Sequence, residues 1–186
     1  MPHNNMTPEF SRPVEVGKIP ARGMEMSITA NAKECTALAR RLGVLELRSL
    51  AAGLELQHAE SGMIAATGEF TAEAVQQCVV TLEPVPVRIR ARLNGLFVPE
   101  NSLPAEDDRA EITDILAEEP EPIVNGMIDL GELAVQHLAL ALDPYPRKPG
   151  AAVDFQPPSE EAERHQNPFS GLEKLIKNKK KQPDSG

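Results

Sequence analysis

The feature that most constrains the fold is an alternation of side-chain types between Val85 and Leu93. Apolar residues occupy every odd position of this stretch, and Arg88, Arg90 and Arg92 occupy three successive even positions. Successive side chains of a β-strand point to opposite faces of a sheet, so a period of two predicts a strand. We therefore expect a strand with one buried face and one strongly basic face.

Other segments favour a sheet around this strand. Alternating patterns predict strands at 12–19, 24–28, 45–56 and 64–70. The dipeptide Ser61-Gly62 is typical of a turn, so we expect the segments before and after it to form successive antiparallel strands.

Two helices are predicted by their boundary residues. Asn31 is a suitable N-cap, and Gly43 follows an apolar face with helical spacing and two arginines in the last turn. Asp129, with Glu132 three residues later, resembles a capping box that opens a second helix, and Pro144 ends it. The predicted fold is α+β: an antiparallel sheet of about five to seven strands with two main helices.

Charge and proline content divide the chain of 186 residues, which is long enough for about one domain. Residues 99–122 hold nine acids, one base and four prolines, which predicts an acidic, mobile loop inside a single domain over 1–150. Residues 151–186 are expected to be a flexible tail with a short amphipathic helix and a lysine cluster. The lysines of this cluster are Lys177, Lys179, Lys180 and Lys181.

Composition excludes several protein classes. Aromatic residues make up only 3% of the chain, which leaves little material for stacking on bases, and the net charge of −9 is the wrong sign for a protein that coats nucleic acid. The N-terminus lacks a secretory pattern, and no apolar stretch approaches the roughly 20 residues of a membrane helix. We expect a cytoplasmic protein with reduced thiols and no contact with membranes.

The sequence gives catalysis and metal binding little support. It has no nucleophile elbow, phosphate-binding loop or dinucleotide loop, and its four histidines are scattered. His137 falls on the apolar face of the second helix, as a packed histidine would. Cys35, on a helix, and Cys78, expected in a strand, are each alone, whereas zinc needs about four ligands in close pairs. No cofactor or metal is expected.

Two charged features have more than one interpretation. Arginines spaced about 6.6 to 7 Å apart on one strand face match successive RNA phosphates, or they form a solvated face paired with the acidic loop. The terminal lysines either increase solubility or dock on ribosomal RNA or an acidic partner. The 99–122 segment either covers a basic ribosomal protein, shields the arginines or is a solvated spacer.

Three motifs, taken in order, resemble those of a known family. They are Cys78-Val-Val-Thr-Leu-Glu-Pro-Val, Ile128-Asp-Leu-Gly-Glu-Leu with the later Ala-Leu-Asp-Pro-Tyr-Pro, and Asn167-Pro-Phe-Ser-Gly-Leu. From about Phe10 to Lys177 the chain resembles the YceD family, the large ribosomal RNA subunit accumulation proteins. The resemblance implies a bacterial cytoplasmic factor, or an organellar relative, with no established catalytic activity.

The motifs carry over residue by residue, with one departure. Cys78 matches the first cysteine of the family's Cys-x-Arg-Cys-Leu pattern, but Val80 and Thr81 stand where the arginine and the second cysteine would be. This departure argues against a zinc or redox role and favours a structural Cys78. The other matching residues are Asp129, Leu130, Gly131 and Glu132, which capping and packing explain, and Asn167, Pro168 and Phe169, which are expected to contact the domain or a partner.

We therefore expect a non-enzymatic factor that supports accumulation or processing of large-subunit (23S) ribosomal RNA. Arg88, Arg90, Arg92 and the lysine cluster are the expected RNA contacts, and the 99–122 segment is the expected contact for a basic protein. The expected partner is the precursor of the large subunit, through its rRNA or a ribosomal protein, and no DNA. Two alternatives remain: an adaptor that binds a basic ribosomal protein, and a metal-dependent rRNA-processing enzyme.

Overall fold

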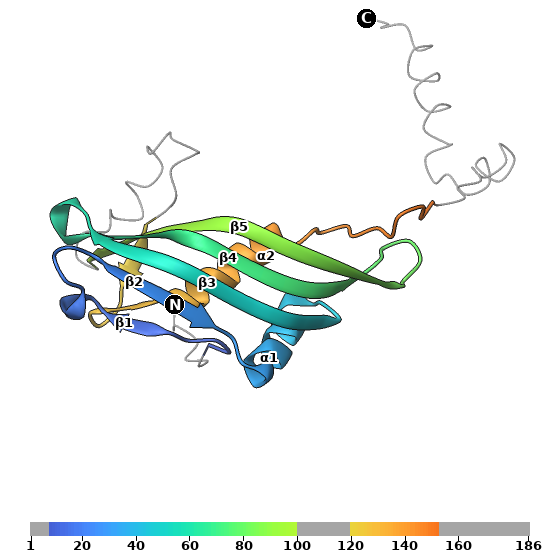
Figure 1. Ribbon diagram of the computed structural model, residues 1–186, viewed down its shortest axis with the longest axis horizontal. Coiled ribbons are helices and arrows are strands. Elements are labelled where there is room, and N and C mark those ends of the chain that lie inside the picture. The colour runs from blue at the N-terminus through green and yellow to red at the C-terminus, as the bar shows by residue number, and fades with distance from the viewer. Residues whose placement is uncertain (1–7, 100–119, 153–186) are drawn as a thin grey trace, which may run out of the picture. The chain divides into compact units, whose positions relative to one another are not determined.

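A five-stranded sheet forms the centre of the fold (Figure 1). The structure, a computed structural model, describes residues 8–99 and 120–152. The strand order is β2-β3-β4-β5-β6, and all neighbours are antiparallel except β5 and β6, which are parallel. The bounds are β2 Met24–Thr29, β3 Glu46–His58, β4 Ile64–Gln77, β5 Pro84–Pro99 and β6 Glu121–Ile123.

A second sheet pairs two short strands from distant parts of the sequence. In it β1 (Pro13–Glu15) lies antiparallel to β7 (Met127–Asp129). Two α-helices, α1 (Ala32–Leu42) and α2 (Leu130–Ala141), and two short 3₁₀ turns, Val16–Lys18 and Glu60–Gly62, complete the elements. The predicted α+β class, with an antiparallel sheet and two helices, is confirmed.

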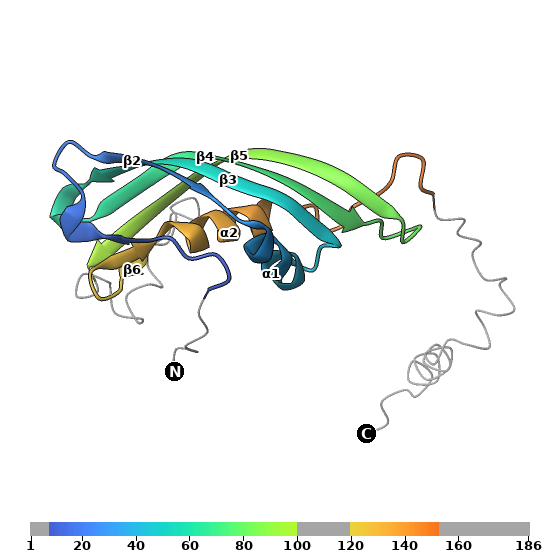
Figure 2. The ribbon, with the colours of Figure 1, turned by 60° about the horizontal axis from the view of Figure 1, so that its bottom comes forward.

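Both helices lie on the same face of the five-stranded sheet. Figure 2 shows the sheet curving over α1 and α2, and no helix of the described residues lies on its other face. Helix α1 contacts β3, and α2 contacts β5 and β1. The sheet therefore has a covered face that forms the core and a second face that no described helix covers; we call the latter the open face.

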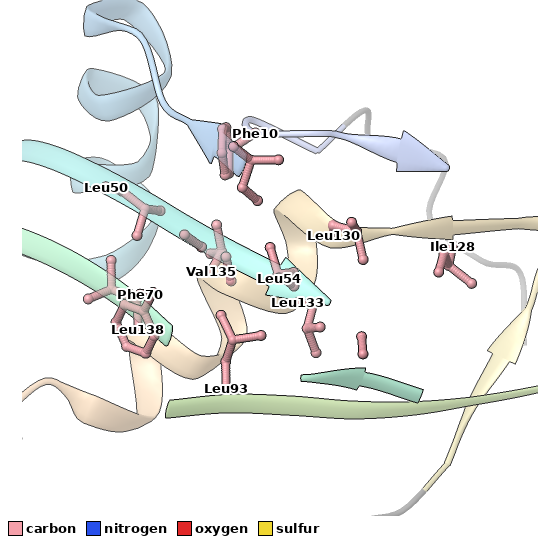
Figure 3. Close-up of a cluster of buried hydrophobic side chains, with 14 of the residues drawn as sticks. Phe10, Leu50, Leu54, Phe70, Leu93, Ile128, Leu130, Leu133, Val135 and Leu138 are labelled. Atoms are coloured by element: carbon pink, nitrogen blue, oxygen red, sulfur yellow. The ribbon is translucent and has the colours of Figure 1, made fainter. Parts of the chain in front are cut away.

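The core lies between the covered face and α2. Leu50 of β3, Phe70 of β4 and Leu93 of β5 are at most 1% exposed, and Figure 3 shows them close to α2 residues such as Leu138. Each such side chain contributes roughly 1.5 to 3 kcal/mol by leaving water. The alternation in β5 thus has the physical cause expected from the sequence: Leu93 belongs to this core, and Val87, Ile89 and Ala91 pack against it.

The predicted start and end of α1 are confirmed. The Asn31 side chain accepts hydrogen bonds from the backbone N–H groups of Lys33 and Glu34, and the Glu34 carboxylate accepts one from the Asn31 N–H. Gly43 ends the helix with φ of 66°, in the left-handed region that favours glycine.

The first predicted strand is shorter than expected. Alternation over 12–19 suggested an edge strand, but only Pro13–Glu15 is extended, and a 3₁₀ turn follows it. This strand joins β7 rather than the main sheet. The strands β6 and β7 were not predicted, because a three-residue strand is too short to display a period.

The bounds predicted for the acidic loop are too wide. Pro99 belongs to β5, and Glu121 and Pro122 belong to β6, where backbone pairing holds them in strands. Residues 100–119 lie outside the described residues, as do 153–186. The described chain up to Ala151 belongs to one compact unit; the boundary near residue 150 remains a prediction.

Candidate nucleic-acid interface

The three arginines of β5 project from the open face. Arg88, Arg90 and Arg92 are exposed, while the residues between them are turned toward the core. In the register of the hairpin they lie opposite Glu73, Thr71 and Glu69 of β4, respectively. A basic row thus runs along one strand, with hydroxyl and carboxylate side chains beside it.

Two of the arginines form ion pairs with β4. Arg88 Nε lies 3.0 Å from Glu73 Oε1, and Arg90 Nη2 lies 2.7 Å from Glu69 Oε2. The arginine side chains are nevertheless 86% and 75% exposed. Exposed pairs of this kind contribute only about 0 to 1 kcal/mol, so they hold the guanidinium groups without removing them from solvent.

The pKa of Glu69 reports the local field. Hydrogen bonding from Arg90, then the charges of Arg90 and Arg92, lower the pKa of the Glu69 carboxyl below its ordinary value. The same hydrogen bond raises the pKa of Arg90. Glu69 is therefore an anion at neutral pH, and it lies in the field of two guanidinium groups.

A shallow hollow of about 980 Å³ lies on the open face beside the arginines. Arg90, Arg92 and Asn94 line one side of it. Glu69 of β4 also lines it, and most of its remaining lining consists of small side chains from β2, β3 and β4. These residues are Ser27, Thr29, Ala51, Gly53, Thr67, Gly68 and Thr71.

Close contact between two strands explains the glycine at position 68. A Cβ on Gly68 would lie 2.0 Å from the backbone oxygen of Gly53 on β3, a distance that no side chain tolerates. The two strands therefore approach at a point where neither residue carries a side chain, and this helps to form the hollow.

Among the described residues, Arg88, Arg90 and Arg92 form the basic row of the open face along β5. Glu25 of β2 lies opposite Glu55 of β3 in the register, and both are exposed on this face. Together with Glu69 and Glu73 they give the rest of the face a negative charge. An anionic ligand is therefore directed to the β5 side of the sheet.

The Asp-Leu-Gly-Glu motif joins α2 to the N-terminal segment. Asp129 accepts hydrogen bonds from the N–H groups of Gly131 and Glu132 at the start of α2, and also from Ser11 Oγ and the Arg12 N–H. Leu130 is fully buried. The predicted cap at Asp129 is confirmed, and it additionally fixes a segment more than 110 residues earlier in the chain.

The return half of the predicted capping box is not formed. The Glu132 carboxylate instead pairs with Arg41 of α1, which also binds Glu9. The reason is tertiary: the C-terminal turn of α1 brings Arg41 to Glu132, and a guanidinium is a stronger partner than a backbone N–H.

Gly131 has a packing role of its own. A Cβ there would lie 2.2 Å from the backbone oxygen of Phe10, so no larger residue fits. Phe10 is itself fully buried, and Figure 3 places it in the core near the start of α2. The motif is thus explained by capping and close packing.

Cys78 lies in the turn after β4, and the expectation that it lies in a strand is wrong. Its thiol is fully buried, and Sγ accepts hydrogen bonds from the backbone N–H groups of Thr81 and Lys148, each at 3.4 Å. The Lys148 N–H, followed by the hydroxyl and N–H of Thr81, lowers the pKa of Cys78 to about 6. Cys78 thereby links the β4–β5 turn to the segment after α2.

His137 ties α2 to the sheet, since its Nε2 lies 2.7 Å from the backbone oxygen of Asn94. Within residues 8–99 and 120–152, no three His, Cys, Asp or Glu side chains gather as a metal site would require. The predicted sites that lie outside the described residues are Asn167, Pro168, Phe169, Lys177, Lys179, Lys180, Lys181 and most of the 99–122 segment.

The sequence analysis missed the carboxylates beside the arginines. Glu69 and Glu73 occupy alternate positions of β4, and the segment 64–70 was predicted as a strand. Their position opposite the arginines follows from the hairpin register, which depends on how the turn at 78–83 closes. The alternation of glutamate with threonine in 67–73 was the available signal.

Among the described residues, none of the helices has the length and apolar character needed to cross a membrane. No curated protein and no solved structure matches the chain. The family model described as large ribosomal RNA subunit accumulation protein YceD matches residues 66–177. This range starts in β4, later than the expected start near Phe10, and it includes the cysteine turn, the Asp-Leu-Gly-Glu motif and the Asn-Pro-Phe motif. The resemblance is thus confirmed, and the chain belongs to the YceD family of large ribosomal RNA subunit accumulation proteins.

Proposed function

We propose that this protein is a non-enzymatic factor of large-subunit ribosomal RNA accumulation, and that it contacts the rRNA through the β5 arginine row. Family membership implies the role in large-subunit rRNA accumulation. The observation that carries the contact is the placement of Arg88, Arg90 and Arg92 on an uncovered sheet face. We further propose that the factor acts in the bacterial cytoplasm.

The spacing of the row supports a contact with phosphates. Alternate residues of a strand lie about 6.6 to 7 Å apart, which is comparable to the distance between successive phosphates of an RNA strand. Each guanidinium offers planar donors that match phosphate oxygens. One RNA backbone that follows β5, whether unpaired or part of a duplex, can therefore meet all three arginines in turn.

The β4 carboxylates that pair with the arginines can be replaced by RNA phosphates. Because the Arg88–Glu73 and Arg90–Glu69 pairs are exposed, replacing a carboxylate by a phosphate costs little. RNA also releases condensed counterions when its phosphates are neutralised, which favours the exchange at low salt. Glu69 and Glu73 then keep the arginines extended in the free protein.

The lysine cluster and the acidic segment remain part of the proposal. Lys177, Lys179, Lys180 and Lys181 would add phosphate contacts, and the 99–122 segment would contact a basic ribosomal protein. Both lie mainly outside the described residues, so their support is their charge in the sequence.

The test is depletion of the protein in its native cell. We expect a selective fall in the ratio of mature large-subunit to small-subunit rRNA, with the protein sedimenting on precursor particles. Complementation with Arg88→Gln/Arg90→Gln/Arg92→Gln should fail to restore the ratio. The matched control, Lys33→Gln/Arg40→Gln, changes two exposed cations of α1 away from the open face and should restore it. An unchanged ratio on depletion would refute the proposed role.

Two assays separate the alternatives. Precursor rRNA incubated with the protein and Mg²⁺ or Mn²⁺ should stay intact, whereas cleavage would support a processing enzyme. Retention of rRNA by the arginine triple variant at the wild-type level would support an adaptor that reaches the particle through a protein partner.

A further inference from the structure

The open face offers no surface on which bases can stack. Among the described residues, Phe10, Phe70 and Phe97 are at most 2% exposed, and Tyr145 lies in the segment after α2. Proteins that recognise single-stranded RNA rely on aromatic side chains that stack on unpaired bases. The described part of this face therefore lacks the aromatic side chains on which unpaired bases stack in most such proteins.

The same face is rich in groups that bind sugar and phosphate. Thr71 lies directly opposite Arg90, and Thr67 lies opposite Asn94, so a hydroxyl and a longer donor stand side by side in two outward rows, with the Glu69–Arg92 row between them. Ser27 and Thr29 add hydroxyls on the far side of the hollow. A hydroxyl both donates and accepts, as does the 2′-hydroxyl of ribose.

The shape of the sheet agrees with this chemistry. Figure 2 shows that the sheet arches over the two helices and that no helix of the described residues lies on the open face. Duplex RNA presents phosphates and 2′-hydroxyls at a wide, shallow minor groove, which a broad open surface can approach. The hollow beside Arg90 and Arg92 can then receive one backbone strand.

We propose that the open face binds double-stranded RNA through its backbone and 2′-hydroxyl groups rather than single-stranded RNA through its bases. This inference rests on the proposed function and names the form of RNA that it uses. The arginine row contacts phosphates along one strand, and the hydroxyls of β4, with those of β2, contact ribose across the hollow.

The test measures binding of the full chain to three labelled probes at low salt by fluorescence anisotropy. The probes are an RNA duplex of about 16 base pairs, one of its two strands alone, and the DNA duplex of the same sequence. We expect the RNA duplex to bind about tenfold or more tightly than either other probe. Thr67→Val/Thr71→Val should remove the preference for RNA over DNA and leave phosphate binding in place.

The control for that variant is Thr36→Val, which changes an exposed threonine of α1 outside the open face and should preserve the preference. Tighter binding of the single strand, or equal binding of the two duplexes by the wild type, would overturn the inference while leaving the proposed function standing. Binding to none of the probes would refute the RNA contact itself, and with it this inference.

Discussion

Arg90 donates two hydrogen bonds to one carboxylate oxygen of Glu69, although the register places Thr71 directly opposite Arg90. The pair is therefore diagonal across the hairpin. Glu69 lies opposite Arg92 and also feels its charge. The Glu69 carboxylate thus accepts hydrogen bonds from Arg90 and interacts with Arg92 through charge alone. The basic row therefore has more N–H donors than the carboxylates of β4 can accept from.

This arrangement predicts that removing the carboxylates strengthens RNA binding. Glu69→Gln/Glu73→Gln takes two negative charges from the face and releases two guanidinium groups, so affinity for duplex RNA at low salt should rise several-fold. Fluorescence anisotropy measures the change. The control is Glu15→Gln, which breaks the exposed ion pair between Lys18 and Glu15 at the end of β1 and should leave the affinity for RNA unchanged. A fall in affinity of the double variant would mean that the carboxylates are needed to position the arginines.

The arginine row should also set the salt dependence of binding. Each phosphate contact that is lost makes the plot of log affinity against log salt shallower by about one. Arg88→Gln/Arg90→Gln/Arg92→Gln should therefore reduce the slope by about three, while Lys33→Gln/Arg40→Gln should not change it. Equal slopes for the triple variant and the wild type would place the phosphate contacts elsewhere in the chain.

Replacing Gly131 should destabilise the fold. Gly131→Ala forces a Cβ against the Phe10 backbone oxygen, and overpacking of this kind costs about 1 to 3 kcal/mol. Gly17→Ala is the matched control, because a Cβ there meets nothing within 4 Å. Urea unfolding monitored by circular dichroism compares the two free energies. Equal midpoints for both variants would show that the segment around Phe10 can move away.

The buried thiol of Cys78 should make stability depend on pH. Its pKa is lowered to about 6 in the fold from an ordinary value of 9.0, so the folded state favours the thiolate. A depressed pKa adds stability that is complete above the unfolded pKa and is lost as pH falls through the folded one. The difference in unfolding free energy between wild type and Cys78→Ala should therefore grow between pH 6 and pH 9.

Cys35 provides the control for this pH dependence. Burial raises the pKa of its thiol, so the fold disfavours the Cys35 thiolate and no gain in stability with rising pH is expected. Urea unfolding of Cys35→Ala across the same range should show a difference from wild type that does not grow. If the difference in unfolding free energy between wild type and Cys78→Ala also stayed constant with pH, the Cys78 thiol of the wild type would remain protonated.

Local patterns predicted the elements, while contacts between distant residues required the structure. The alternation in β5 and the caps at Asn31 and Asp129 are encoded within a few residues, and they were predicted. The bonds from Ser11 and Arg12 to Asp129 join segments that only the folded chain brings together.

The candidate site follows the same division. The exposure of the arginines follows from their period of two, whereas their pairing with Glu69 and Glu73 depends on the hairpin register. The close approach that requires Gly131 arises from Phe10, and nothing near position 131 in the sequence signals it.

The parallel pairing of β5 with β6 bears on how the protein can be altered. Phe97 pairs with Glu121 and Pro99 with Ile123, so the chain leaves the sheet and re-enters it on adjacent strands, which lie about 4.8 Å apart. The two attachment points of the intervening sequence therefore lie close together. Because closure entropy grows slowly with loop length, an inserted reporter domain or an evolutionary expansion at this position leaves the arginine row and the core in place.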